Sequence, residues 1–201
     1  MKNKIIAIHQ PEHFPYMGFF QKMSACDLFV ILDDVQFEKD GFQNRNKIVI
    51  EGREEWITVP VEKNSDSKII KDVNIAKCNP GKQGVWQRKI IQKIMRAYQV
   101  DVTEIYSHNS LIDINLAAID LMRNYFGITT PMIRSSMLDY TGKKSKLVAN
   151  IVRAVGGTHY LSGQGGKNYI DLTDFEGIQV DFFEPKVSHY YSCLHEMNRS
   201  V

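Results

Sequence analysis

The stretch that decides the fold covers residues 4–33 and reads KIIAIHQPEHFPYMGFFQKMSACDLFVILD. Residues 4–8 form a short apolar run typical of a strand that is buried on both faces. Two prolines keep the following residues extended, and a helix is expected to start near Tyr16. Residues 27–33 form a second buried strand. A strand, a helix and a strand within about thirty residues predict a βαβ unit, whose right-handed crossover makes the two strands parallel.

The rest of the chain continues this alternation of short strands and amphipathic helices. Residues 47–50 and 55–61 flank the polar turn EGRE and predict a β-hairpin. Apolar periodicity and end signals predict strands at 69–75, 131–134, 159–161 and 177–183, helices at 83–98, 110–126 and 143–155, a polar loop at 62–68 and a turn at 77–82. For the helix at 110–126, Ser110 is the expected N-cap and Gly127 the residue that ends it.

These elements predict an α/β fold with a mostly parallel, Rossmann-like layered sheet, flanking helices and an inserted β-hairpin. We expect one domain over residues 1–201. Its N-terminal half, residues 1–76, holds the polar motifs of a site, and its second half, residues 83–201, is largely helical.

Composition excludes several classes of protein. The net charge is only +2 and the basic residues are scattered, so we expect no nucleic-acid partner. No apolar run approaches the roughly eighteen residues of a membrane span, and the run before His9 is too short for a signal peptide. Three cysteines at irregular spacing argue against a disulfide framework. We therefore expect a cytoplasmic protein with reduced thiols and no insertion into membranes.

Polar side chains follow the first two predicted strands at the points where the strands end. His9 follows the first strand, and Asp33 and Asp34 end the second. The carboxyl ends of parallel strands share the edge at which open α/β sheets bind ligands. His9 is therefore predicted as a general base or acid, and Asp34 as the group that orients His9 or binds substrate. Adjacent strand residues point to opposite faces, so at most one of the two aspartates is expected in the site.

Further candidates for substrate binding lie before the hairpin and after the strand at 159–161. Arg45 is predicted to hold phosphate through its planar guanidinium, with Asn44 and Asn46 orienting the substrate. The structural alternatives are that Arg45 pairs with a carboxylate and that the asparagines close backbone turns. The complete set of predicted substrate-binding residues is Gln10, His13, Asn44, Arg45, Asn46, Ser162 and Gly163.

A metal site is not predicted. His13 follows His9 by four residues, but the prolines between and after them disfavour a helical pair, and no closed set of ligands is visible. The loop SGQGG at 162–166 lacks the spacing of a phosphate-binding P-loop, and it fits a plain turn as well as a ligand contact. The sequence leaves the cofactor open.

Several segments also match a known family in order along the chain. They are HQPEHFPYMGFFQK at 9–22, DLFVILDDVQFEKDGFQNRN at 27–46, WITVPV at 56–61, SSML at 135–138 and YLSGQGGKNY at 160–169. On these segments the chain resembles the WbqC-like protein family of bacteria. After His189 the residues differ from the family's usual ending.

The resemblance implies work on nucleotide-activated sugars, because such proteins are often encoded among genes for O-antigen and other surface polysaccharides. Transfer of an acyl or aminoacyl group to an amino sugar is the reaction that this context favours. The alternatives are an adenylate-forming or nucleotidyl-transferring enzyme and a non-catalytic sugar-nucleotide-binding or assembly protein. The expected partner is a small molecule, a nucleotide sugar, and a homo-oligomer is compatible with the sequence.

Overall fold

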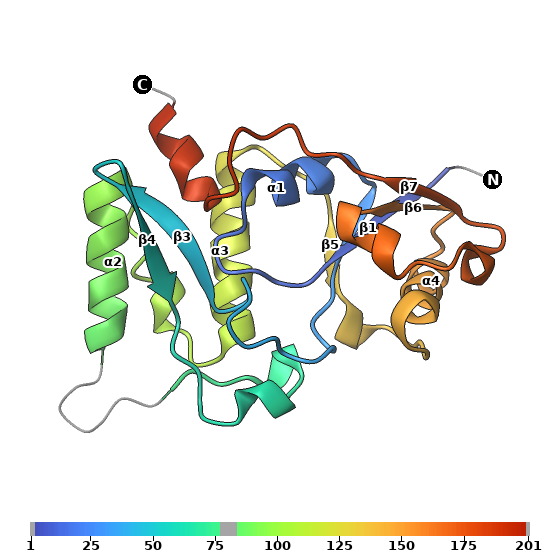
Figure 1. The fold of residues 1–201 in the computed structure, drawn as a ribbon, viewed down its shortest axis with the longest axis horizontal. Coiled ribbons are helices and arrows are strands. Elements are labelled where there is room, and N and C mark those ends of the chain that lie inside the picture. The colour runs from blue at the N-terminus through green and yellow to red at the C-terminus, as the bar shows by residue number, and fades with distance from the viewer. Residues whose placement is uncertain (1–2, 77–83, 200–201) are drawn as a thin grey trace. The chain divides into compact units, whose positions relative to one another are not determined.

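The first strand of the chain is also the central strand of its sheet. A computed structural model describes residues 3–76 and 84–199 (Figure 1). Strand β1 (Ile5–His9) pairs in parallel with β2 (Leu28–Ile31) on one side and with β6 (His159–Ser162) on the other. Strand β5 (Met132–Arg134) extends the sheet beside β2, and β7 (Gln179–Phe182) extends it beside β6. The order β5-β2-β1-β6-β7 confirms the predicted parallel, layered α/β sheet.

The direction of winding reverses beside β1. The chain runs outward from β1 to β2 and β5, and then returns to the other side of β1 for β6 and β7. The reversal therefore lies between β1 and β6. Open α/β sheets bind ligands outside the carboxyl ends of the strands at such a switch point.

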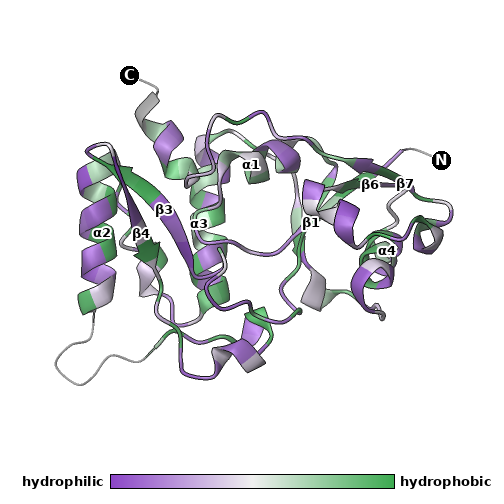
Figure 2. Cartoon of the chain, in the orientation of Figure 1, coloured by the Kyte–Doolittle hydropathy of each residue, from purple (hydrophilic) through white to green (hydrophobic). Residues whose placement is uncertain are grey.

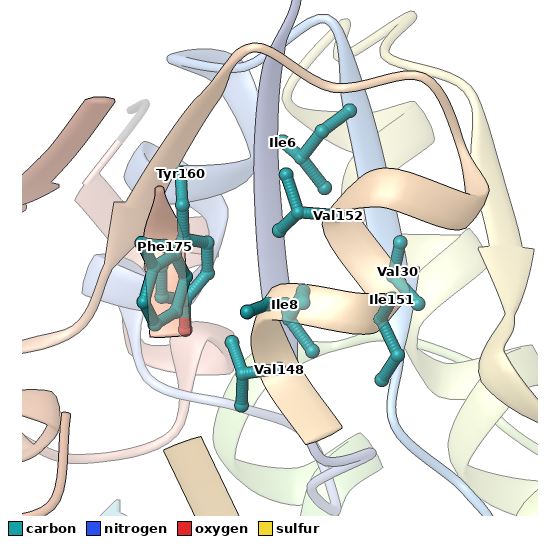
Figure 3. Close-up of a cluster of buried hydrophobic side chains, with 9 residues drawn as sticks. Ile6, Ile8, Val30, Val148, Ile151, Val152, Tyr160 and Phe175 are labelled. Atoms are coloured by element: carbon teal, nitrogen blue, oxygen red, sulfur yellow. The ribbon is translucent and has the colours of Figure 1, made fainter. Parts of the chain in front are cut away.

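Helices pack on both faces of this sheet. On one face, α4 (Lys144–Ala154) contributes Val148, Ile151 and Val152 to a core with side chains of β1, β2 and β6 (Figure 3). Strand residues alternate between faces, so His9 points to the opposite face from the core residue Ile8. That face is covered by α1 (Met17–Ser24), whose Phe19 ring lies 5.0 Å from the His9 ring.

The described residues form two units, and each unit draws on separate segments of the chain. Unit 1 comprises Met1–Gln10, Gly18–Asp33 and Ile128–Ser188, and unit 2 comprises Pro11–Met17, Asp34–Gly127 and His189–Val201. Both predicted halves of the chain contribute to both units, so the unit boundary does not follow the boundary between residues 1–76 and 83–201.

Unit 2 contains the predicted hairpin and two of the helices. Strands β3 (Arg45–Ile50) and β4 (Arg53–Thr58) pair in an antiparallel manner, as predicted. The residues between them, Glu51 and Gly52, both have positive φ, which suits a two-residue turn. The helices are α2 (Val85–Tyr98) and α3 (Leu111–Tyr125), and hydrophilic and hydrophobic bands alternate along α2 (Figure 2).

The predicted strand at 69–75 is wrong. The structure has a 3₁₀ helix, η2 (Ile70–Asp72), and isolated bridges at Ile69, Asn74 and Ile75 in place of a strand. Within residues 69–75, the fully buried side chains are those of Ile70 and Val73, which are three residues apart. This spacing fits a helical turn, whereas a strand buries alternate residues.

The described residues also contain short 3₁₀ helices. The 3₁₀ helices are η1 (Ser65–Ser67), η3 (Ile105–Ser107), η4 (Ser135–Met137), η5 (Gln164–Asn168), η6 (Leu172–Phe175) and η7 (Cys193–Arg199). The predicted turn at 77–82 lies outside the described residues. Within residues 3–76 and 84–199, no helix combines the length and the apolar character that crossing a bilayer requires.

Candidate functional site

A lysine ammonium lies where β1 and β6 part. The pairing of these strands ends at Ala7 and Leu161, and the next carbonyl, that of Ile8, accepts a hydrogen bond of 3.2 Å from Nζ of Lys22. Gly163 follows β6 on the other side, and a β-carbon built there would lie 3.7 Å from the same Nζ. The switch point of the sheet therefore carries a positive charge.

Helix α1 delivers this lysine from its buried face. Lys22 is only 3% exposed, and it follows the fully buried Phe19 by three residues. Its Nζ lies 5.9 Å from the centre of the Phe29 ring of β2. The aliphatic stem of a buried lysine packs against apolar surface while its ammonium group reaches polar groups. In this protein the ammonium group of Lys22 reaches the carboxyl end of β1.

His9 lies beside this charge as the last residue of β1. Its Nδ1 is 3.0 Å from the carbonyl oxygen of Gln10. Since a carbonyl only accepts hydrogen bonds, Nδ1 carries the proton and Nε2 is the acceptor nitrogen. Burial and, secondly, the charge of Lys22 lower the pKa of His9 to about 3. His9 is therefore a neutral hydrogen-bond acceptor at pH 7.

The other predicted residues of unit 1 divide into two kinds. Gln10 and Gly163 follow the carboxyl ends of β1 and β6, so the structure brings them to the switch point with His9. The side chain of Ser162 is buried, and its hydroxyl donates to the Gly163 carbonyl at 3.0 Å. A β-carbon at Gly166 would clash with the same hydroxyl oxygen. The Ser162 hydroxyl thus closes the loop after β6.

The two adjacent aspartates have different surroundings. Asp33 is fully buried, and its carboxylate accepts hydrogen bonds from Nε of Arg134 at 2.6 Å and from the Ser136 hydroxyl at 2.9 Å. The Ser136 backbone N–H and the Ser135 hydroxyl donate to it as well. Asp33 therefore joins the carboxyl ends of β2 and β5. Asp34 is the first residue of its segment of unit 2.

His13 belongs to a buried hydrogen-bond network of unit 2. Its Nδ1 is 3.2 Å from Oδ1 of Asn115, and its Nε2 is 3.0 Å from the Tyr106 hydroxyl. Asn115 in turn donates to the Gln43 carbonyl at 2.7 Å. The side chain is fully buried, and burial lowers the pKa of His13 to about 4. Both ring nitrogens are engaged inside the protein, and a substrate-binding role for His13 stays a prediction.

Arg45 makes the ion pair of the structural alternative, whereas the side-chain amides of Asn44 and Asn46 bond to carbonyls distant in the sequence rather than closing a local turn. The side-chain amides of Asn44 and Asn46 donate to the Val59 and Phe14 carbonyls at 3.1 and 2.8 Å. Arg45 forms an ion pair of 3.1 Å with Asp40, and its guanidinium lies 4.6 Å from the Trp56 ring. A phosphate-binding role for Arg45 stays a prediction, and it would compete with these contacts.

The next features are the metal-ligating side chains and the cysteine thiols of the described residues. Within residues 3–76 and 84–199, no group of three or more His, Cys, Asp or Glu side chains could hold an ion. Cys26 and Cys193 are free thiols, and burial raises the pKa of Cys26 to about 11. A thiol with a raised pKa is a poor nucleophile at neutral pH. Cys78 lies outside the described residues.

The share of the chain that a family model matches shows whether the chain belongs to that family. The model of the WbqC-like protein family matches residues 10–198. The chain belongs to this family. The match runs past His189, so the C-terminal segment belongs to the WbqC-like region although its motifs are not evident in the sequence. The uncharacterised protein Rv1507c of Mycobacterium tuberculosis is 28% identical over 191 residues, which cover 90% of this chain and 82% of that protein. No solved structure matches the chain.

Two residues near the carboxyl ends of the strands, Lys22 and Arg134, were not predicted from the sequence. Lys22 interrupts an apolar helix at a position that shares the face of Phe19, and this was the available signal. Arg134 directly precedes two serines at the end of β5, but its role depends on the distant Asp33. Only the folded sheet brings these residues to the same edge.

Proposed function

We propose that this WbqC-like protein binds a nucleotide-activated sugar at the carboxyl ends of β1 and β6 and modifies the sugar for a bacterial surface polysaccharide such as O-antigen. The observation that carries the proposal is the buried ammonium of Lys22 beside the neutral His9 at the switch point of the sheet. Phosphate is an anion that suits such a position. The family membership supports the polysaccharide context.

The proposed chemistry is acyl or aminoacyl transfer to an amino sugar. The amine nitrogen attacks the carbonyl carbon of an activated acyl donor, and the leaving group departs with the electrons of its bond. Nε2 of His9 accepts the proton that the amine loses. A phosphate bound at Lys22 raises the pKa of His9, because a nearby negative charge favours the protonated imidazole. Substrate binding thus makes His9 a stronger base than it is in the free protein.

Replacement of Lys22 tests the binding step. We expect Lys22→Met to weaken binding of a uridine diphosphate sugar by about tenfold to a hundredfold, the equivalent of losing one charge-assisted hydrogen bond. Methionine suits apolar surroundings, so the melting temperature should not fall. Calorimetric titration and a melting curve measure both effects.

Lys146→Met is the matched control. Lys146 is an exposed lysine of α4 in the same unit, so its replacement removes the same charge away from the strand ends. Equal losses in both variants would show a general charge effect and contradict the proposal. Failure of the wild type to bind any of a panel of nucleotide sugars would also contradict it. Incubation with donor and acceptor then separates transfer from pyrophosphate release, which would mark nucleotidyl transfer or adenylation.

A further inference from the structure

Arg134 lies on the same face and at the same level of the sheet as His9. In the register of the strands, His9 is opposite Ile31, and Ile31 is opposite Arg134. Residues in register on neighbouring parallel strands point to the same face. Neighbouring strands lie about 4.8 Å apart, so the Cα atoms of His9 and Arg134 are about 10 Å apart along the edge. Both are the last residues of their strands.

The buried carboxylate of Asp33 holds the guanidinium of Arg134 through its Nε atom. The bond from Nε to Oδ2 of Asp33 is 2.6 Å long, and Asp33 is itself held by Ser135 and Ser136. The Arg134 side chain is 32% exposed, whereas Asp33 is fully buried. Within residues 3–76 and 84–199, the terminal amino groups of Arg134 have no hydrogen-bond partner. A guanidinium has five donors, so those of the terminal groups are left for a ligand.

We propose that Arg134 is a second anion-binding residue of the site, and that Lys22 and Arg134 together bind the two phosphates of a nucleoside diphosphate sugar. This inference rests on the proposed function and narrows its substrate class. A nucleoside monophosphate sugar has a single phosphate and would engage only one of the two cations. The planar guanidinium suits a phosphate through two parallel hydrogen bonds, and Asp33 holds it in a fixed orientation before the ligand arrives.

The competing explanation is that Arg134 only neutralises the buried charge of Asp33. Arg134→Lys distinguishes the two roles, because lysine keeps a positive charge that can pair with Asp33 but lacks the two-pronged donor set. A purely structural Arg134 predicts a changed melting temperature with unchanged ligand affinity. A ligand-binding Arg134 predicts a loss that depends on the second phosphate.

Inorganic phosphate and inorganic pyrophosphate are the probes for calorimetric titration. We expect Arg134→Lys to weaken pyrophosphate binding by about tenfold or more and to leave phosphate binding within about twofold of the wild type. Lys22→Met should weaken both. Arg153→Lys is the control: Arg153 lies in α4 of unit 1, and its guanidinium donates to the Asp174 carbonyl. Its replacement should change neither affinity.

The outcomes separate this inference from the proposed function. If the wild type binds both probes and Arg134→Lys binds both with unchanged affinity, the inference is overturned and the proposed function stands. If the wild type binds nucleotide sugars but neither probe, the inference is again overturned and the proposed function stands; if it binds no nucleotide sugar either, both fail. A second test, chemical modification of Arg134, uses only the wild type and therefore does not depend on the folding of a variant. Pyrophosphate, but not phosphate, should protect Arg134 from modification by phenylglyoxal, as read by peptide mapping. Equal protection by both probes, or by neither, overturns the inference.

Discussion

His9 and His13 both lie in surroundings that disfavour a positive charge. Burial is the larger cause for each, and it lowers the pKa of His9 to about 3 and that of His13 to about 4. The consequences differ. The ring of His13 is enclosed by Asn115 and Tyr106, whereas His9 ends a strand beside Lys22. One histidine is therefore a core residue and the other is the proposed base.

Because His9 and His13 resist protonation in the folded protein, we expect the free energy of unfolding to fall in acid. The unfolded chain protonates its histidines near pH 6.5, whereas the folded protein resists protonation down to about pH 4 for His13 and about pH 3 for His9. The unfolded state thus binds more protons below pH 6.5. We expect the free energy of unfolding to be highest above that pH and to fall by up to about 1.4 kcal/mol per pH unit for each histidine as the pH decreases. Urea unfolding between pH 7.5 and about 4.5 measures the slope. A flat profile over this range would show that neither histidine resists protonation.

Individual residues of the candidate site were predictable where strand ends are visible in the sequence. His9, Gln10 and Gly163 follow apolar runs, so parallel pairing alone places them at one edge. Lys22 was missed because lysines on helices are usually exposed, and its burial depends on tertiary packing. The pairing of Ala7 with Leu161 is equally hidden, since no local pattern encodes a partner so distant in sequence.

At the scale of elements, local signals succeeded where the chain carries its own stop and start residues. Ser110 caps α3 by accepting a hydrogen bond of 3.2 Å from the backbone N–H of Asp113, as the sequence predicts. The hairpin is likewise encoded by its turn. The segment 69–75 was predicted wrongly because its β-branched residues favour a strand, whereas packing buries Ile70 and Val73 together.

Replacement of the capping serine should weaken α3 measurably. Ser110→Ala leaves the N–H of Asp113 without its acceptor, and we expect the free energy of unfolding to fall by about 1 kcal/mol. Chemical denaturation measures this loss. Ser107→Ala is the control, because the Ser107 hydroxyl donates to the Glu104 carbonyl and caps no α-helix. A cap role would be refuted by equal changes in the two variants.

At the scale of the whole molecule, the C-terminal segment is part of unit 2. The Ser192 N–H donates to the Lys47 carbonyl of β3 at 2.9 Å, and the Cys193 N–H donates to the Pro15 carbonyl at 2.8 Å. Cys193 and Leu194 are fully buried. The C-terminal segment, which the family model covers as far as residue 198, therefore has a structural role in unit 2.

Removal of the residues after Ser188 should destabilise unit 2 selectively. The deletion removes these backbone hydrogen bonds and the buried Leu194, and a single buried leucine stabilises a protein by about 2–5 kcal/mol relative to alanine. Hydrogen exchange should show lost protection for β3 amides, with β1 amides still protected. Leu194→Ala in the full chain should give the same pattern at smaller amplitude. Unchanged exchange in β3 would contradict this role of the segment.

The distant pairing of β1 has a consequence for synthesis on the ribosome. Ile5 pairs with His159, so a nascent chain carries its central strand for more than a hundred and fifty residues before that partner exists. During this time β1 has β2 on one side and an open edge on the other, and open edges invite pairing with other chains. Unit 2 likewise awaits Ser192–Leu194. Folding of both units therefore waits until residues 159–194 have been synthesised, and chains released before that are exposed to aggregation.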